Sequence, residues 1–252
     1  MIKGLYTAAT GMINQQQRMD IISNNLANVN TTGFKKDGVV VQSFEDVLTL
    51  KVNDSKLPNA PIGNMNLGVK LGEVYTDFNQ GSFIQTNDPF NIALQGEGFI
   101  NIGITDEEGN FDNRYTRDGS FVLSKEGELM TKDGFNVMGQ NGEIVLDKGD
   151  VRINEKGQVF LNDEHIDTIN IVNFDKEDAR KIGDNLYSIE EDVEPMEFEG
   201  QVLQGFLEES NVNSIREMVD MINVMRSFES NQKVVQTQDE TLGKAVNDIA
   251  RL

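Results

Sequence analysis

The feature that most constrains the fold of this chain is a seven-residue apolar repeat near its C-terminal end. Met221, Phe228, Val235, Leu242 and Ile249 follow one another at intervals of seven residues. The second position of the repeat holds apolar and polar residues, namely Val224, Asn231, Gln238, Ala245 and Leu252. Such spacing places the side chains on one face of a helix with coiled-coil character. A helix of about 36 residues would be roughly 54 Å long, and a stripe of that length needs partners outside a globule of this size.

The expected start of this helix is a capping box. Ser214 and Glu217 have the spacing in which a serine at the N-cap is paired with a glutamate at the third helical position. No proline follows Ser214, and Gly243 is the only glycine after it. We therefore predict one uninterrupted helix from Ser214 onward.

A second heptad repeat occupies the N-terminal end. Leu5, Met12, Met19 and Leu26 are seven residues apart, which predicts an amphipathic helix over residues 2–28. Polar residues interrupt the stripe, and two glycines each cost about 1 kcal/mol relative to alanine inside a helix. Alone in water such a segment is marginal, so its ordering should depend on what covers the apolar face.

Between the helices the pattern changes to short alternating runs separated by glycine turns, which predicts an antiparallel meander or small barrel. The fold class expected is therefore α+β, with helices at both ends of a β-rich middle. Strands are expected at 69–75, 90–94, 99–104, 120–124, 143–146, 158–161, 168–174 and 186–189. Residues 49–66 and the acidic stretch 190–199 read as surface loops because they contain proline among polar residues.

The net charge of −20 is distributed unevenly. Residues 1–30 carry two basic and one acidic side chain, and residues 211–252 carry five basic and six acidic ones. The whole net charge thus lies in residues 31–210, which keeps that region soluble and leaves the two ends near neutral for packing. Nucleic-acid binding is disfavoured, since phosphates need a basic face.

Candidate sites for chemistry are weak. The chain has no cysteine and a single histidine, His165, which we expect to be a solvated residue on a turn. The glycines of Gln95–Phe99 lack the third glycine of a dinucleotide fingerprint and read as a strand turn. Residues 106–109 do not supply the ligands of a calcium loop. We expect no catalytic residue, no metal and no cofactor.

Three sequence segments carry a resemblance to a known family. Ile22–Lys35, read as ISNNLANVNTTGFK, closely resembles the signature of flagellar axial proteins, the rod and hook family. Ser210–Asn213 and the helix after it resemble the closing segment of that family. The segments YTRDGSF at 115–121, QGEGF at 95–99 and DNLY at 184–187 are similar to the middle of its distal-rod and proximal-rod branch, and the chain is most like the distal rod.

The resemblance implies a structural subunit of the flagellar basal-body rod that polymerises into a helical drive shaft. It implies copies of the chain and other flagellar axial proteins as partners, export through the flagellar type III apparatus without a cleaved Sec signal, and contact with bushing rings. Terminal helices of family members pack as an inner layer and are disordered in the free subunit. No apolar segment long enough to span a membrane occurs.

The residues expected to act in assembly lie on the two helices and at the turn after the first one. At that turn the asparagines should bond backbone groups, Gly33 should adopt positive φ, and Phe34 should anchor the chain in the next domain. The methionines could pack between subunits or within one subunit. The full expected set is Leu5, Met12, Met19, Asn24, Asn25, Leu26, Asn28, Gly33, Phe34, Met218, Met221, Met225, Phe228, Val235, Leu242 and Ile249.

The expected organisation has three parts. Residues 1–30 form the N-terminal assembly helix and 211–252 the C-terminal one, with a β-rich body at 31–210. Within that body, 31–95 and 185–210 form an inner part and 96–184 an outer part. The alternatives are a hook-type axial protein, a secreted acidic carbohydrate-acting enzyme, which would need two carboxylates about 5–10 Å apart, and a surface adhesin with coiled-coil ends.

Overall fold

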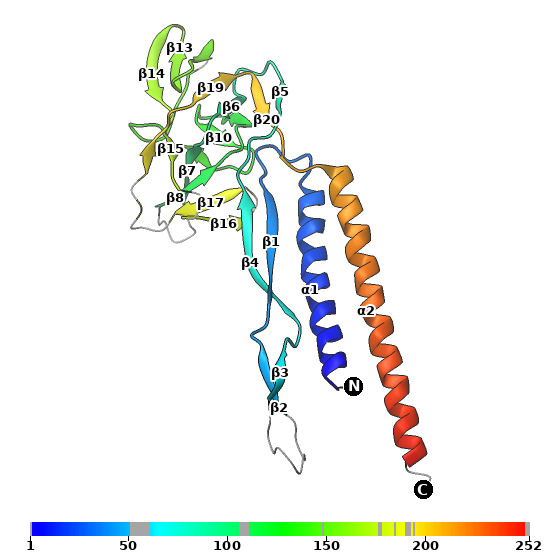
Figure 1. Cartoon of the computed structure of the whole chain (residues 1–252). Helices are drawn as coiled ribbons and strands as arrows, with labels where there is room; N and C mark the ends of the chain where they lie inside the picture. Colours follow the sequence, from blue (N-terminus) through cyan, green and yellow to red (C-terminus); the bar gives the residue numbers. More distant parts are fainter. Residues whose placement is uncertain are drawn as a thin grey trace. The chain divides into compact units, whose positions relative to one another are not determined.

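A computed structural model describes residues 2–50, 61–105, 111–147, 149–175, 178–183, 185–189, 193 and 195–249. Helices lie at both ends of the chain and antiparallel strands fill the middle, which confirms the expected fold class (Figure 1). The chain groups into two compact units, the first made of Met1–Ala27, Asp37–Tyr75 and Asn213–Leu252, the second of Asn28–Lys36 and Thr76–Val212. The expected boundaries at residues 30 and 210 remain a prediction.

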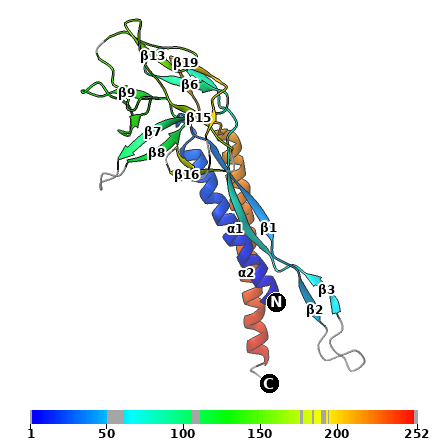
Figure 2. The ribbon, with the colours of Figure 1, turned by 90° about the vertical axis from the view of Figure 1, so that its left-hand side faces the viewer.

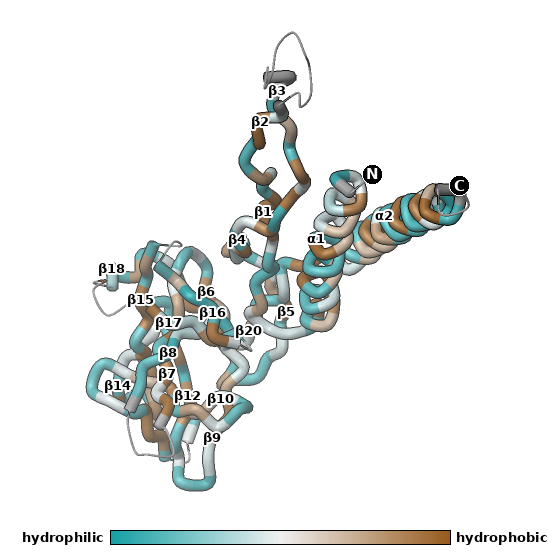
Figure 3. The backbone as a smooth tube through the Cα atoms, turned by 90° about the horizontal axis from the view of Figure 1, so that it is seen from below, coloured by the Kyte–Doolittle hydropathy of each residue, from teal (hydrophilic) through white to brown (hydrophobic). Residues whose placement is uncertain are grey.

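The first unit contains the two helices and a ribbon of strands. Its elements are α1 (Ile2–Ala27), β1 (Lys36–Ser43), β2 (Val47–Leu50), β3 (Pro61–Met65), β4 (Val69–Asp77) and α2 (Ser214–Ile249). The helices lie side by side and run in opposite directions in two perpendicular views (Figures 1 and 2). Hydrophobic and hydrophilic residues alternate along both of them (Figure 3), as expected for helices that each bury one face.

The strand ribbon corrects one expectation. β1 pairs with β4, and β2 pairs with β3 in antiparallel register, so residues 49–50 and 61–65 belong to strands where a loop was expected over 49–66. Pro61 is compatible with this because proline is tolerated at the first residue of a strand. Residues 51–60 of the expected loop lie outside the described part of the chain.

The second unit is built from antiparallel sheets. A nine-stranded sheet follows the order β16-β17-β8-β7-β11-β10-β9, with β15 pairing with both β7 and β18, while β12, β13 and β14 form a three-stranded sheet. β6 pairs with β19 and β5 with β20. The bounds are β5 Phe83–Gln85, β6 Ile92–Gln95, β7 Phe99–Thr105, β8 Phe111–Thr116, β9 Phe121–Leu123, β10 Leu129–Thr131, β11 Asn136–Val137, β12 Val151–Ile153, β13 Gln158–Leu161, β14 Glu164–Thr168, β15 Ile171–Asn173, β16 Ala179–Gly183, β17 Leu186–Ile189, β18 Met196–Glu197, β19 Gln201–Gln204 and β20 Phe206–Glu208.

Most expected strands are present, and β13 and β17 match the expected runs to the residue. Residues 143–146 are an exception, since Glu143 and Val145 make single bridges to Met138 and Glu128 instead of a strand. Residues 196–197 of the expected acidic loop form β18. His165 lies in β14, not on a turn, with its ring 5.5 Å from that of Phe160.

Two buried clusters hold the second unit together. The larger one is mostly aliphatic, with Ile92, Leu94, Ile100 and Leu129 packed around Phe121. The smaller one is aromatic: Phe99 stacks on Phe174 with ring centroids 4.3 Å apart and meets Tyr187 at 5.2 Å. Offset and edge-to-face aromatic pairs add about 0.5–1.5 kcal/mol beyond their buried area, so this cluster is a rigid support for β7, β8 and β17.

Candidate assembly site

The start of α2 is capped one residue earlier than expected. The side-chain oxygen of Asn213 accepts a hydrogen bond from the backbone N–H of Arg216 at 3.0 Å, and the Asn213 carbonyl accepts from Glu217 N at 3.0 Å. Asn213 is therefore the N-cap, and the assignment of this role to Ser214 was wrong. With Asn213 as the N-cap, Glu217 is the fourth residue of the helix and cannot form the expected capping box with Ser214. Its side chain is buried.

One face of α2 packs against α1, and we call this face the seam. Its residues are Glu217, Met221, Val224, Phe228, Asn231, Val235, Gln238 and Leu242, all buried or half-buried. Four residues of the expected assembly set, Met221, Phe228, Val235 and Leu242, belong to it. Ile249 is the last residue of α2, and its side chain lies outside the described part. The heptad stripe is thus used, at least in part, within one chain.

The opposite face of α2 carries a second set of apolar residues, which we call the free stripe. It comprises Ile215, Met218, Val219, Ile222 and Met225, which are 47–74% exposed. Their spacing of three, four, seven and ten residues from the first places them on one face. Met218 and Met225 therefore differ from Met221, since they point away from the seam. This separation was not visible in a heptad pattern assigned to one stripe.

The expected assembly residues of α1 are partly covered by the rest of the chain. Leu5, Met12, Met19 and Leu26 are all half-buried. On an outer face of the same helix, Tyr6 and Ile13 are at least half exposed and lie seven residues apart. α1 therefore also presents apolar side chains that its own chain covers only in part, since the Tyr6 ring lies 6.4 Å from that of Phe44 and remains half exposed.

Asn25 fastens the end of α1 to β1. Its side-chain nitrogen donates to the carbonyl of Asp37 at 2.8 Å, and its side-chain oxygen accepts from the Asp37 N–H at 2.9 Å. This pair of bonds mimics a strand pairing and confirms that Asn25 bonds backbone groups. Asn24 is exposed on the neighbouring face.

The loop from Asn28 to Lys36, here called the junction loop, follows α1 in the chain and belongs to the second unit. Asn28 accepts from the Thr31 hydroxyl at 3.1 Å. Gly33 has φ 68°, which confirms its expected positive φ, and Phe34 is buried with the Lys181 ammonium 4.0 Å from its ring centroid. The turn that the sequence pattern indicated is therefore formed by these residues.

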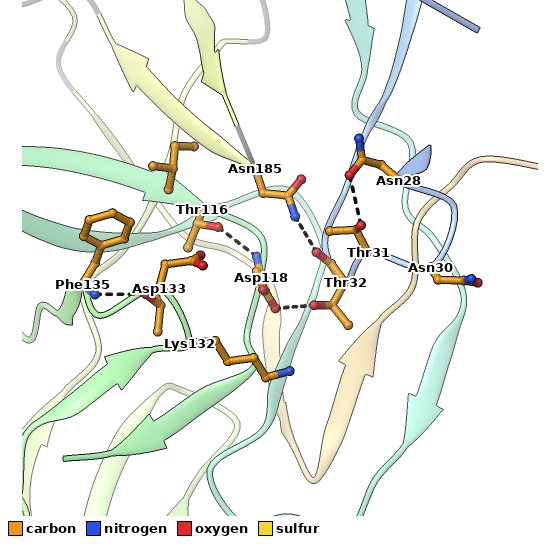
Figure 4. Close-up of a pocket in the computed structure, with 12 residues that line it drawn as sticks. Asn28, Asn30, Thr31, Thr32, Thr116, Asp118, Lys132, Asp133, Phe135 and Asn185 are labelled. Atoms are coloured by element: carbon orange, nitrogen blue, oxygen red, sulfur yellow. Dashed lines mark hydrogen bonds between the residues drawn. The ribbon is translucent and has the colours of Figure 1, made fainter. Parts of the chain in front are cut away.

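The junction loop borders a polar cavity of about 350 Å³ (Figure 4). Thr32 donates from its hydroxyl to Asp118 at 2.6 Å, and its carbonyl accepts from the Asn185 amide at 2.7 Å. Asp118 also accepts from the N–H of Ser120. These bonds join the junction loop to the segment after β8 and to the residue before β17.

A buried charge cluster, which we name the Glu208 cluster, was not expected from the sequence. Glu208 accepts from Lys35 at 2.6 Å and, with its other oxygen, from Arg117 at 3.4 Å, and none of these three side chains is more than 3% exposed. The Gly81 N–H donates to the first oxygen at 2.9 Å, and Gly33 N donates to the Glu208 carbonyl. The cluster thereby holds Gly33 and Lys35 of the junction loop against β20.

Burial governs the charge state of the cluster. It lowers the pKa of Lys35, and the neighbouring Glu208 carboxylate offsets part of that shift. The pKa of Arg117 is lowered by burial as well, with Glu208 acting in the opposite direction. Both cations also donate to carbonyls, Lys35 to Asn79 and Arg117 to Gly96. A network of this kind is stable only while each charge keeps its partner.

The described residues include neither a candidate metal cluster nor a membrane-spanning helix. No three acidic or histidine side chains among them gather as they would around a metal ion. None of the helices, over the residues described, combines the length and hydrophobicity of a membrane span. Gly96 has φ 116° in the turn between β6 and β7, as expected for a strand turn. Residues 106–109 lie outside the described part.

Comparison with known proteins identifies three matching segments. Residues 5–35 match the model described as "Flagella basal body rod protein". Residues 93–161 match "Flagellar hook protein FlgE/F/G D1 domain", and residues 203–248 match "Flagellar basal body rod FlgEFG protein C-terminal". The first match includes α1 from Leu5 onward and the junction loop up to Lys35, and the last includes Glu208 and nearly all of α2.

Similar proteins match over nearly the whole chain. The flagellar basal-body rod protein FlgG of Borreliella burgdorferi is 36% identical, with 98% of each chain covered. FlgG of Bacillus subtilis is 34% identical, covering 98% of this chain and 99% of its own. The flagellar hook-basal body complex protein FlhO of Bacillus subtilis is 32% identical, with both chains covered completely.

Proposed function

This chain belongs to the flagellar basal-body rod family and is a structural subunit of the rod, and we propose that it joins neighbouring axial subunits through the outer faces of its two terminal helices. The observation that carries the proposal is the free stripe. Five large apolar side chains lie uncovered on a helix whose other face is already paired.

Exposed apolar patches of this kind mark protein interaction sites. Each large side chain that a neighbour buries contributes about 1.5–3 kcal/mol from the hydrophobic effect, before the cost of association. Tyr6 and Ile13 add partly exposed apolar side chains on α1. Many such contacts, repeated along a polymer, would make a stiff shaft.

The chain is located in the flagellar basal body and assembles with other axial flagellar proteins, as its family does. The proposal further includes export through the flagellar type III apparatus and contact of the acidic β-rich region with bushing rings. The distribution of charge supports packing through the ends. Residues 31–210 carry the net charge of −20, so these regions of neighbouring subunits repel one another, while the near-neutral ends can pack. A hook-type role is not favoured, because the relatives matched over their full length are named for the rod or the hook-basal body complex.

The test places one charge on the free stripe. Ile222→Asp should abolish incorporation into isolated basal bodies and motility, because an aspartate cannot be buried there without a partner. Ser227→Asp is the matched control, since it adds the same charge at an exposed position of the same helix that lies off the free stripe. Both variants should retain the thermal stability of the purified subunit. Normal incorporation of Ile222→Asp would sink the proposal.

A further inference from the structure

The seam between α1 and α2 contains polar layers at places where the heptad pattern breaks. Asn231 and Gln238 occupy seam positions that apolar residues would ordinarily fill. Opposite each of them α1 has a glycine. A Cβ atom on Gly11 would lie 2.9 Å from the Asn231 side-chain nitrogen, and one on Gly4 would lie 3.6 Å from that of Gln238.

A third polar layer lies at the other end of the pair. The Asn25 amide donates to the Glu217 carboxylate at 3.5 Å, and both side chains are buried. Asn25 lies 14 residues after Gly11 and 21 after Gly4. Glu217 lies 14 residues before Asn231 and 21 before Gln238. Each step of seven along α1 is therefore matched by a step of seven in the opposite direction along α2.

These layers are costly unless they meet their partners. Glycine in a helix interior costs about 1 kcal/mol relative to alanine, and polar seam residues lower the stability of a coiled coil while they specify its register. The Gln238 side-chain oxygen is buried without a hydrogen-bond partner, which adds to the cost. All three polar layers occur at the same alignment of α1 with α2, which indicates that they select the partner helix and its alignment.

We propose that the three polar layers specify α1 of the same chain as the partner of the seam and fix the antiparallel register of the pair. Gly4 and Gly11 are the only glycines of α1. A side chain at Gly11 would crowd the Asn231 amide, whereas one at Gly4 would meet Gln238 at ordinary contact distance. Pairing of α2 with the α2 of a second copy would place both polar side chains against larger residues. A shift by one heptad separates Asn25 from Glu217.

This inference concerns the same two helices as the proposed function. It assigns one face of α2 to pairing within the chain and the opposite face to contact with neighbouring subunits. The seam is reserved for the chain's own α1, so a neighbouring axial subunit is left with the free stripe and the outer face of α1. Polar layers thereby act against wrong pairing between copies, which is a hazard for any protein that is concentrated into a polymer with exposed heptads.

Cysteine crosslinking tests this inference, because the chain has no cysteine of its own. The pairs Gly11→Cys/Asn231→Cys and Gly4→Cys/Gln238→Cys match the register, and Gly11→Cys/Gln238→Cys is shifted by one heptad. Purified protein and isolated basal bodies are oxidised and run on denaturing gels without reductant. Free thiols are counted, and bridged peptides are identified by mass spectrometry.

Matched pairs should form bridges within one chain, at least about tenfold more than the shifted pair, which corresponds to about 1.4 kcal/mol of register preference. Bridges between chains, or equal yields from matched and shifted pairs, would overturn the inference. In the Gly4→Cys/Gln238→Cys background, Asn231→Leu should reduce the yield severalfold, while Gln236→Leu should not. Motility is scored separately with Ile222→Asp, so failure of the register inference and failure of the proposed function give different results.

Discussion

At the scale of single residues, Glu208 determines whether two buried cations keep a partner. Lys35 and Arg117 reach it from positions 173 and 91 residues away in sequence. Glu208→Gln should destabilise the protein by about 3–5 kcal/mol, because removing one partner leaves uncompensated buried charge. Unfolding in urea measures the loss.

The matched control for Glu208 is the pair Asp112–Arg114, whose side chains are 45% and 26% exposed. Asp112→Asn should cost less than about 1 kcal/mol, because solvent screens such pairs. Similar losses in the two variants would contradict the importance of burial for the Glu208 cluster.

Gly33 combines a positive φ with close packing. A Cβ atom there would lie 2.5 Å from the Arg117 carbonyl carbon and the Asp118 nitrogen. Gly134 also has a positive φ, 91°, but a Cβ atom on it would meet nothing within 4 Å. Gly134→Ala should cost about 1–2 kcal/mol for the backbone conformation alone. Gly33→Ala should cost roughly 1–3 kcal/mol more because of the clash, and equal midpoints of urea unfolding would contradict this account.

Residues whose roles depend on neighbours in the sequence could be predicted, whereas residues whose roles depend on distant parts of the chain could not. Gly33 and Phe34 could be assigned from the local turn pattern, since the positive φ depends on adjacent residues. Lys35, Arg117 and Glu208 could not, because only the fold brings together positions so far apart. Glu217 was misassigned for a related reason: Asn213 supplies the same local cap as Ser214, and the burial of Glu217 depends on Asn25 in another helix.

At the scale of elements, Phe228 tests the seam. Phe228→Asp introduces a charge between α1 and α2, and we expect a loss of about 1–3 kcal/mol because the carboxylate is partly desolvated without a partner. Thermal unfolding followed by far-ultraviolet circular dichroism should show the helical signal lost at lower temperature. Ser227→Asp adds the same charge one residue away on an exposed position and should leave the transition unchanged. A shared transition temperature would mean that the seam adds nothing to stability.

The heptad repeats predicted both helices well, because their spacing depends on residues that are close in sequence. Their partners were harder to predict. The strict repeat of α2 indicated one apolar stripe, whereas the structure separates the seam, with Met221 and Phe228, from the free stripe, with Met218 and Met225. From the sequence of α1 alone, its glycines only weaken the helix. Their place opposite Asn231 and Gln238 becomes visible once α2 is packed against α1.

At the scale of the whole molecule, the chain divides its properties along its length. The net charge lies in residues 31–210, and the uncovered apolar helix faces lie at the ends. Apolar surface that remains uncovered in a single chain gains most from a neighbour. This distribution agrees with a rod subunit whose helices pack and whose acidic region stays solvated.

The central claim is that the free stripe contacts neighbouring axial subunits in the assembled rod. The most direct measurement places a photo-crosslinking amino acid at Ile222 and, as control, at Ser227, which is exposed but lies off the free stripe, and identifies the adducts in isolated basal bodies. The account predicts adducts between chains from position 222 and few or none from position 227. Assembled rods in which position 222 yields no adduct with another subunit would contradict it.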